Sequence, residues 1–100
     1  LVKAAMFGAD ANWGRVICAL GYSGVEFDPK LVDISFKSND EICCCKEGKG
    51  LDFDEEKAKE ILLQEEIEIV CDMHNGSESC TCWGCDLTYD YVKINGDYRT

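Results

Sequence analysis

An alternation of apolar and acidic side chains in the second half of the chain limits its fold more than any other feature. The apolar members of this pattern are Ile67, Ile69, Cys71 and Met73, and the acidic members are Glu66, Glu68 and Asp72. Successive side chains of a β-strand point to opposite faces, so this period of two predicts a strand with one buried face. Val32, Ile34 and Phe36 repeat the pattern. Strands of this kind need another layer to cover their apolar face.

Helices are predicted from apolar residues that are spaced three and four apart. One such segment covers residues 13–20 and follows Asp10 or Asn12, either of which can cap a helix. A second follows Asp54, a good N-cap, and continues to about Gln64. Acidic residues fill its first turn, where the helix dipole favours anions.

The remaining segments predict short strands and turns. We expect a strand at Leu1–Phe7, and a hairpin in which residues 41–46 return beside the strand at 32–36. Asn75-Gly76 is a strong hairpin signal, with Ser79–Cys85 as the partner strand of residues 67–73. Asp86 is expected to cap a final short helix through Tyr89 and Val92. The predicted fold class is therefore α+β: a two-layer domain, mostly antiparallel sheet with helices packed on one face.

Length and charge bound the class of protein. One hundred residues suit a single domain, 1–100. The 20 acidic and 10 basic residues give a net charge of −10, which a phosphate backbone would repel, so we expect no nucleic-acid partner. No apolar run has the length of a membrane span and none resembles a signal peptide, so we expect no membrane partner and a cytoplasmic protein. The chain begins within an apolar run and without an initiator Met, which predicts a fragment or a processed subunit.

The eight cysteines lie mostly inside apolar runs, where a thiol acts as a small hydrophobe. They are Cys18, Cys43, Cys44, Cys45, Cys71, Cys80, Cys82 and Cys85. We expect reduced, buried thiols, as in a cytosolic protein. The alternative is a thiol-ligated metal module on Cys80, Cys82 and Cys85 with His74 as a fourth ligand. On a strand Cys80 and Cys82 share one face and Cys85 lies on the other, so we predict no metal and no cofactor.

Catalytic groups are scarce in this sequence. His74 is the only histidine and lies beside a predicted turn, so we interpret it as a solvated hairpin residue. Neither a Ser-His-Asp nor a Cys-His set can be assembled around it. The glycine pairs at 21–24 and 48–50 lack the spacing of a phosphate-binding loop. We predict no catalytic residue within the chain.

The C-terminal residues 83–100 (WGCDLTYDYVKINGDYRT) are unusually rich in aromatic side chains for a chain end. Ordering aromatic residues costs entropy, so we expect this tail to be docked. A docked tail can present Asn95, Arg99 and Thr100 to a small polar ligand. The alternative is a segment that only completes the core.

Four stretches together resemble one known family. They are residues 1–15 (LVKAAMFGADANWGR), 21–29 (GYSGVEFDP), 52–58 (DFDEEKA) and the tail at 83–100. In this order they are similar to the C-terminal part of the ornithine acetyltransferase (bifunctional glutamate N-acetyltransferase) family of arginine biosynthesis. The resemblance runs through all 100 residues, and the tail motif is highly specific.

The resemblance implies an enzyme that cuts itself autocatalytically into an alpha and a beta chain. This chain would be the C-terminal part of the beta chain, and the parent would contain two alpha and two beta chains. A threonine upstream of this chain would carry acetyl from N-acetylornithine to glutamate. Bifunctional members also use acetyl-CoA. The substrate-binding positions that carry over are Asn95 and Thr100, and Arg99 is either a carboxylate clamp or part of a structural ion pair.

The sequence departs from the family pattern at a few positions. Ala11 stands where proline is common, which loosens a helix entry without removing a reactive group. Cysteines replace small residues of an alanine-rich run before Trp83. Gly96 stands where alanine is usual and adds backbone freedom beside Asn95. Beside the acetyltransferase hypothesis, the metal module and a structural interaction domain with an exposed apolar face remain alternatives.

Overall fold

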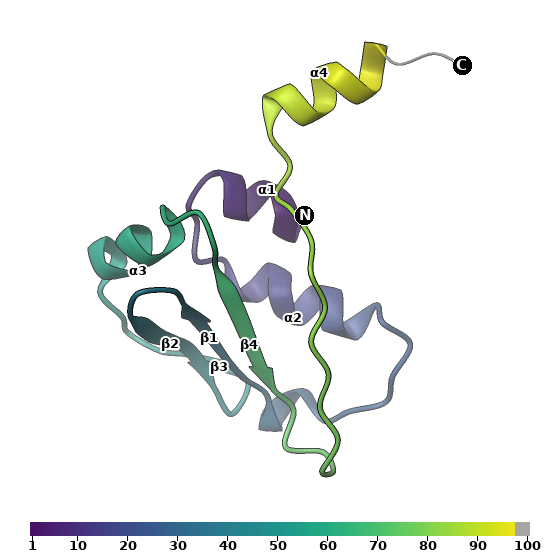
Figure 1. Cartoon of the computed structure of the whole chain (residues 1–100). Coiled ribbons are helices and arrows are strands. Elements are labelled where there is room, and N and C mark those ends of the chain that lie inside the picture. Colours follow the sequence, from purple (N-terminus) through teal and green to yellow (C-terminus); the bar gives the residue numbers. More distant parts are fainter. Residues whose placement is uncertain (98–100) are drawn as a thin grey trace.

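The computed structural model of the protein describes residues 1–97 (Figure 1). The helices are α1 (Val2–Phe7), α2 (Trp13–Gly21), the 3-10 turn η1 (Pro29–Leu31), α3 (Glu55–Leu62) and α4 (Tyr89–Asp97). The strands are β1 (Asp33–Lys37), β2 (Glu41–Lys46), β3 (Lys49–Gly50) and β4 (Glu68–Asp72). The predicted fold class, α+β with an antiparallel sheet, is confirmed.

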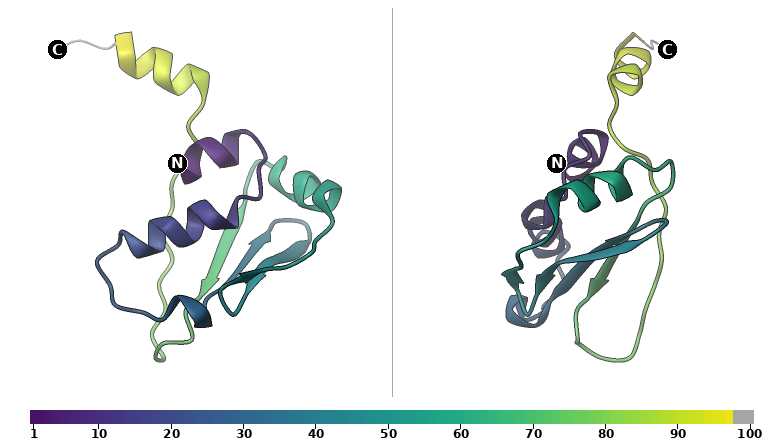
Figure 2. Two further views of the ribbon diagram at one scale, coloured as in Figure 1. Left: turned by 180° about the vertical axis from the view of Figure 1, so that it is seen from behind. Right: turned by 90° about the vertical axis from the view of Figure 1, so that its left-hand side faces the viewer.

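The strands form one antiparallel sheet in the order β3-β2-β1-β4. β1 lies between β2 and β4, and in its register with β4 Phe36 stands opposite Ile69. Helices α2 and α3 lie on one face of this sheet, as predicted, and α1 lies on the same face (Figure 2). The extended chain after β4 runs along the other side. The apolar core therefore lies between the sheet and the three helices.

The core is built from alternate residues of the strands together with one face of each covering helix. Its buried members are Ala11, Val16, Val32, Ile34, Phe36, Ile42, Cys44, Cys45, Ala58, Ile61 and Leu62. Two adjacent cysteines belong to it because the β1–β2 register shifts between Ile34 and Ser35. An extra residue in one strand changes which face its side chains reach, so Cys44 and Cys45 can both be buried.

Side-chain caps fix the start of the core helices where the sequence predicts them. Asn12 rather than Asp10 caps α2, since its Oδ1 accepts a hydrogen bond of 3.1 Å from the Arg15 amide. Asp54 caps α3 and accepts hydrogen bonds from the amides of Glu56 and Lys57. Each cap satisfies amides that have no partner inside the helix.

The predicted strand at Leu1–Phe7 is wrong, because residues 2–7 form α1. Val2, Ala5 and Met6 are spaced three and four apart, and all three contact the core or are buried, as a helix face requires. Lysine, alanine and methionine in this segment also favour a helix.

The predicted partner strand at Ser79–Cys85 is also wrong, because residues 79–85 have no regular structure. The structure shows Gly76 with a φ of +98°, as a tight turn requires, but the chain then leaves the sheet instead of returning along β4. All side chains of residues 79–85 are exposed in the described chain, so no burial there offsets the cost of ordering this segment along β4.

The expected docking of the tail onto the body of the chain is wrong for α4. This helix projects from the rest of the molecule (Figure 1), and its described residues include no buried side chain. The radius of gyration is 14.8 Å, above the roughly 13 Å of a compact chain of this length, because of this projection. Within residues 1–97, no helix is both long and apolar enough to cross a membrane.

Candidate functional site

Helix α4 carries the predicted substrate-binding residue Asn95, and its first turn contacts α1. Thr88 caps the helix, since its Oγ1 accepts a hydrogen bond of 2.9 Å from the Tyr91 amide. The predicted cap, Asp86, is therefore wrong by two residues. The Tyr89 ring meets Phe7 edge to face at 5.4 Å, and the Lys3 ammonium lies 5.1 Å from the centre of the Tyr91 ring. These contacts hold the start of α4 and leave its end free.

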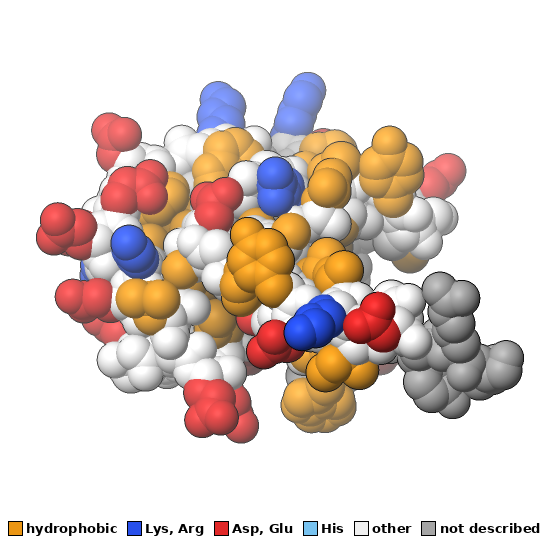
Figure 3. Space-filling view, turned by 90° about the horizontal axis from the view of Figure 1, so that it is seen from above, with side chains coloured by type: hydrophobic (Ala, Val, Ile, Leu, Met, Phe, Trp, Pro, Cys, Tyr) orange, Lys and Arg blue, Asp and Glu red, His pale blue; other side chains and the backbone are white. Residues whose placement is uncertain are grey.

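Asn95 lies on the projecting part of α4 and is exposed. Its Nδ2 donates a 2.8 Å hydrogen bond to the Tyr91 carbonyl, one turn back in the same helix. This bond fixes the amide and leaves its oxygen and one N–H available to a ligand. Figure 3 shows apolar and charged side chains together on this end of the molecule, next to the C-terminus. The other predicted tail residues, Arg99 and Thr100, lie outside the described residues.

His74 belongs to a charged cluster that the sequence analysis missed. Its Nε2 lies 2.8 Å from Asp33 Oδ2, and its Nδ1 lies 3.5 Å from Asp72 Oδ1. The cluster forms because Asp33 and Asp72 are opposite each other in the β1–β4 register. His74 is thus an ion-pair partner of the sheet, and the predicted hairpin around it is absent. Sequence reasoning could have found this cluster only by pairing Asp33 with Asp72, and that pairing depends on knowing the register between β1 and β4.

The charges of this cluster shift each other's protonation. The hydrogen bond to Asp33 raises the pKa of His74 above its ordinary value, and the nearby Asp72 carboxylate adds to this effect. The same hydrogen bond, together with the Glu47 amide that donates to Asp33, lowers the pKa of Asp33. His74 therefore contacts two carboxylates, and no Ser-His or Cys-His pair involves it among the contacts of the described chain.

Cys44 and Cys45 are buried, Cys43 and Cys71 are partly buried, the other four cysteines are exposed, and all eight are free thiols. Burial raises the pKa of Cys44 to about 12, so this thiol stays protonated. The prediction of buried thiols is wrong for Cys18, Cys80, Cys82 and Cys85, which are exposed. Nowhere in residues 1–97 do three or more His, Cys, Asp or Glu side chains group so that they could hold a metal ion. The metal alternative thus gains no support from the geometry.

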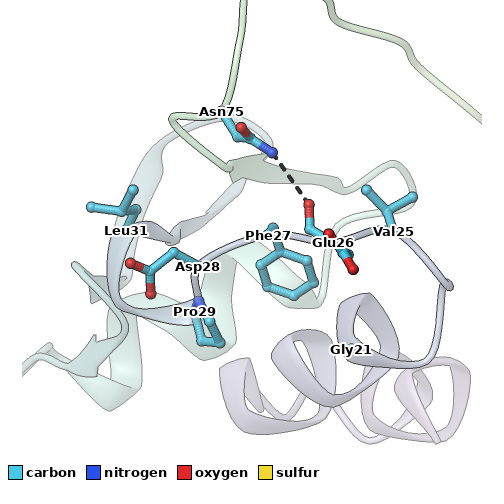
Figure 4. Close-up of a pocket in the computed structure, with 8 residues that line it drawn as sticks. All are labelled: Gly21, Val25, Glu26, Phe27, Asp28, Pro29, Leu31 and Asn75. Carbon is cyan, nitrogen blue, oxygen red and sulfur yellow. Dashed lines mark hydrogen bonds between the residues drawn. The ribbon is translucent and has the colours of Figure 1, made fainter.

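A shallow hollow lies between the loop after α2 and the turn after β4 (Figure 4). Val25, Phe27 and Leu31 line it together with Glu26 and Asp28. Asn75 closes one side, and its Nδ2 donates a 3.3 Å hydrogen bond to the Glu26 carbonyl. The turn that carries Asn75 is at the end of the molecule away from α4 (Figure 1), so the hollow and Asn95 cannot form one site within this chain.

Fold and site together define a two-layer α+β domain whose candidate ligand-binding residue lies on a projecting helix. A model of the ArgJ family matches residues 1–100, and the chain belongs to that family. The resemblance drawn from the four sequence stretches is thereby confirmed.

Two relatives extend this result. The chain is 61% identical to "Arginine biosynthesis bifunctional protein ArgJ 1" of Clostridium acetobutylicum, over 100% of this chain and 25% of that protein. It is 51% identical to "Glutamate N-acetyltransferase" of Methanopyrus kandleri, over 100% of this chain and 26% of that protein. The chain therefore spans about a quarter of the length of these relatives.

A solved structure supports the fold independently. The crystal structure of the arginine biosynthesis bifunctional protein argJ from Bacillus halodurans matches with a TM-score of 0.89 and 45% identity. The match covers 97% of this chain and 45% of that chain. This chain corresponds to 45% of the solved chain but to only 25% of the relative from Clostridium acetobutylicum. The solved chain is therefore much shorter than that relative.

Proposed function

We propose that this chain is the C-terminal part of an acetyltransferase of arginine biosynthesis and forms one wall of its substrate pocket. The observation that carries the proposal is the family match over all 100 residues, which includes relatives named glutamate N-acetyltransferase. The isolated chain is inactive in this proposal, because the nucleophile lies upstream.

The proposed reaction moves an acetyl group through a threonine of the parent enzyme. The threonine hydroxyl attacks the acetyl carbonyl of N-acetylornithine, the amide C–N bond breaks, and ornithine leaves with the proton on its amine. The α-amine of glutamate then attacks the resulting ester, and the C–O bond breaks to restore the threonine. A self-cleaved parent of two alpha and two beta chains belongs to the same proposal. The short length of the solved relative's chain is consistent with a parent made in two pieces.

Asn95 and Thr100 are proposed to hold the amino-acid substrate beside this threonine. The Asn95 amide can accept a hydrogen bond from an α-ammonium group and donate one to a carboxylate. Its hydrogen bond to the Tyr91 carbonyl fixes the orientation of the amide. The Thr100 hydroxyl can likewise accept a hydrogen bond from the ammonium group and donate one to the carboxylate. Two such contacts place a substrate amine or carbonyl for attack, which supplies part of the rate enhancement in acyl transfer.

The test is acetyl transfer from N-acetylornithine to glutamate by the complete enzyme. A hydrogen bond to a charged group is worth about 1.5–3 kcal/mol, so Asn95→Ala should lower kcat/KM by roughly tenfold to a hundredfold. Thr100→Val removes the hydroxyl and keeps the branched shape of the side chain, and should have a similar effect. Thr100→Ser should retain most of the activity.

Asn39→Ala is the matched control, because Asn39 is an exposed asparagine in the turn between β1 and β2. Its kcat/KM should equal that of the unaltered enzyme. If Asn95→Ala and Thr100→Val also leave kcat/KM unchanged, the two residues do not bind substrate. Thermal unfolding of each variant separates loss of binding from loss of folding.

A further inference from the structure

The segment between β4 and α4 is held at both ends and unpaired between them. At its start Asn75 Nδ2 donates to the Glu26 carbonyl, and at its end the Leu87 amide donates to the Lys3 carbonyl at 3.2 Å. Between these anchors, residues 77–86 make no main-chain hydrogen bond to any described residue. Main-chain N–H and C=O groups without a protein partner form hydrogen bonds either to water or to another polypeptide segment. The composition of this segment indicates which of the two partners it has.

Residues 79–85 (SCTCWGC) are unlike an ordinary surface loop. They contain no charged residue, although 30% of the chain is charged. They contain three cysteines and a tryptophan whose side chain is 89% exposed. Both residue types are usually buried, and a short apolar, uncharged run without proline is the kind of sequence that pairs with a sheet edge.

We infer that residues 77–86 form a docking strand that pairs with the edge of a β-sheet in the part of the protein outside this chain. Main-chain hydrogen bonds would supply the attachment, and an apolar pocket beside that edge would take Trp83. The partner is assigned to the same protein because this chain covers only 25% of its relative from Clostridium acetobutylicum, so most of such a protein lies outside. The inference rests on family membership and not on the proposed substrate contacts.

The position of the segment suits such a partner. Figure 2 shows it on the side of the sheet that carries no helix, away from α1, α2 and α3. The edge of β4 is adjacent in sequence, yet the chain passes it without pairing within the described residues. With both ends anchored, the segment is preorganised, which lowers the entropic cost of adding a strand.

Residue-resolved hydrogen exchange in the complete enzyme tests the pairing. A strand paired on one edge has every second amide bonded, so we expect amides of residues 79–85 to exchange alternately slowly and fast. The slow amides should exchange roughly a hundredfold more slowly than the amide of Asn39, in the exposed β1–β2 turn. Uniformly fast exchange, or protection without alternation, overturns the inference.

A second experiment identifies the partner. A photoreactive label on Cys82 of the complete enzyme should cross-link to residues of the enzyme outside this chain, while the same label on the exposed Cys18 should not reach those residues. Cross-links from Cys82 to β4 would indicate the hairpin that was predicted from the sequence, and would contradict the inference. Cross-links to residues 77–86 of a second copy would contradict it as well. Cys82→Ser should abolish the Cys82 product, and acetyl transfer by that variant shows independently whether the enzyme is intact.

Discussion

Residues 1–72 and residues 73–97 contain similar kinds of side chains but use them in different ways. Every buried residue of the described chain lies in the first region, which we call the body. The second region, which we call the arm, holds Trp83, Tyr89 and Ile94 with 89%, 83% and 68% of their surface exposed. The difference teaches that the body buries its core within the chain, whereas the arm buries no side chain among the described residues.

The largest expected difference between body and arm comes from the core. Phe36 lies on the central strand and is fully buried. Phe36→Ala should lower the free energy of unfolding by about 3–5 kcal/mol through lost burial and a cavity. Chemical denaturation of the 100-residue chain measures this loss. Ile94→Ala in the arm should change it by less than about 0.5 kcal/mol, and a comparable loss there would remove the distinction.

Two glycines with positive φ give the next comparison. Gly48 has a φ of +73°, and a Cβ there would collide with the Pro29 carbonyl oxygen. Gly48→Ala should therefore cost about 2–4 kcal/mol, from the left-handed backbone and the displaced neighbour together. Gly76, in the arm, has a φ of +98° with open space around it, so Gly76→Ala should cost only about 1–2 kcal/mol. If Gly48→Ala and Gly76→Ala lower the free energy of unfolding equally, the body accommodates a Cβ at position 48 beside the Pro29 carbonyl oxygen.

Helix caps extend the comparison to smaller effects. Asp54→Ala removes the cap of α3 and should lower the free energy of unfolding by about 1 kcal/mol. Thr88→Val removes the cap of α4 in the arm, where no tertiary burial depends on it, and should leave the denaturation midpoint of the body unchanged. A midpoint shift in Thr88→Val would mean that α4 unfolds together with the body.

The smallest effect is the pH dependence of the His74–Asp33 pair, which joins arm to body. Hydrogen bonding raises the pKa of His74, so its contribution is complete below the ordinary value of 6.5 and disappears as pH rises through the raised value. The pKa of Asp33 is lowered, so its contribution is present above 3.8 and disappears as pH falls through the lowered value. His74→Gln should therefore destabilise the chain more near pH 5.5 than near pH 8. Equal destabilisation at both pH values would argue against the ion pair.

The sequence predicted most of the body correctly because its apolar spacings and caps each fit one type of secondary structure. The alternation at residues 32–36 and 67–73 requires half-buried strands, and the caps at Asn12 and Asp54 set the helix starts. The first helix was missed because residues 1–7 are apolar except for Lys3, which leaves strand and helix both open until Val2, Ala5 and Met6 are seen to pack. The double burial of Cys44 and Cys45 depends on a register shift that local patterns do not encode.

The arm was predicted less well because its patterns describe contacts outside the chain. Ser79–Cys85 has the composition of a strand, but its partner is not β4. The aromatic tail predicted docking, but α4 is exposed along its length in the described chain. Asn95, Arg99 and Thr100 were candidates from the polar groups of the tail, and only the family motif singled out Asn95 and Thr100 as predicted substrate-binding residues. The exposure of His74 was predicted, but its ion pair with Asp33 was missed because Asp33 lies on a strand 41 residues away.

The most direct test of the division into body and arm is hydrogen exchange of the isolated 100-residue chain beside the complete enzyme. The account predicts equal protection of β1, β2 and α3 in both samples, because their contacts lie within the chain. It predicts protection of alternate amides in residues 79–85 only in the complete enzyme, where the partner strand is present. An arm that is equally protected in the isolated chain, or a body that loses its protection there, would contradict the account.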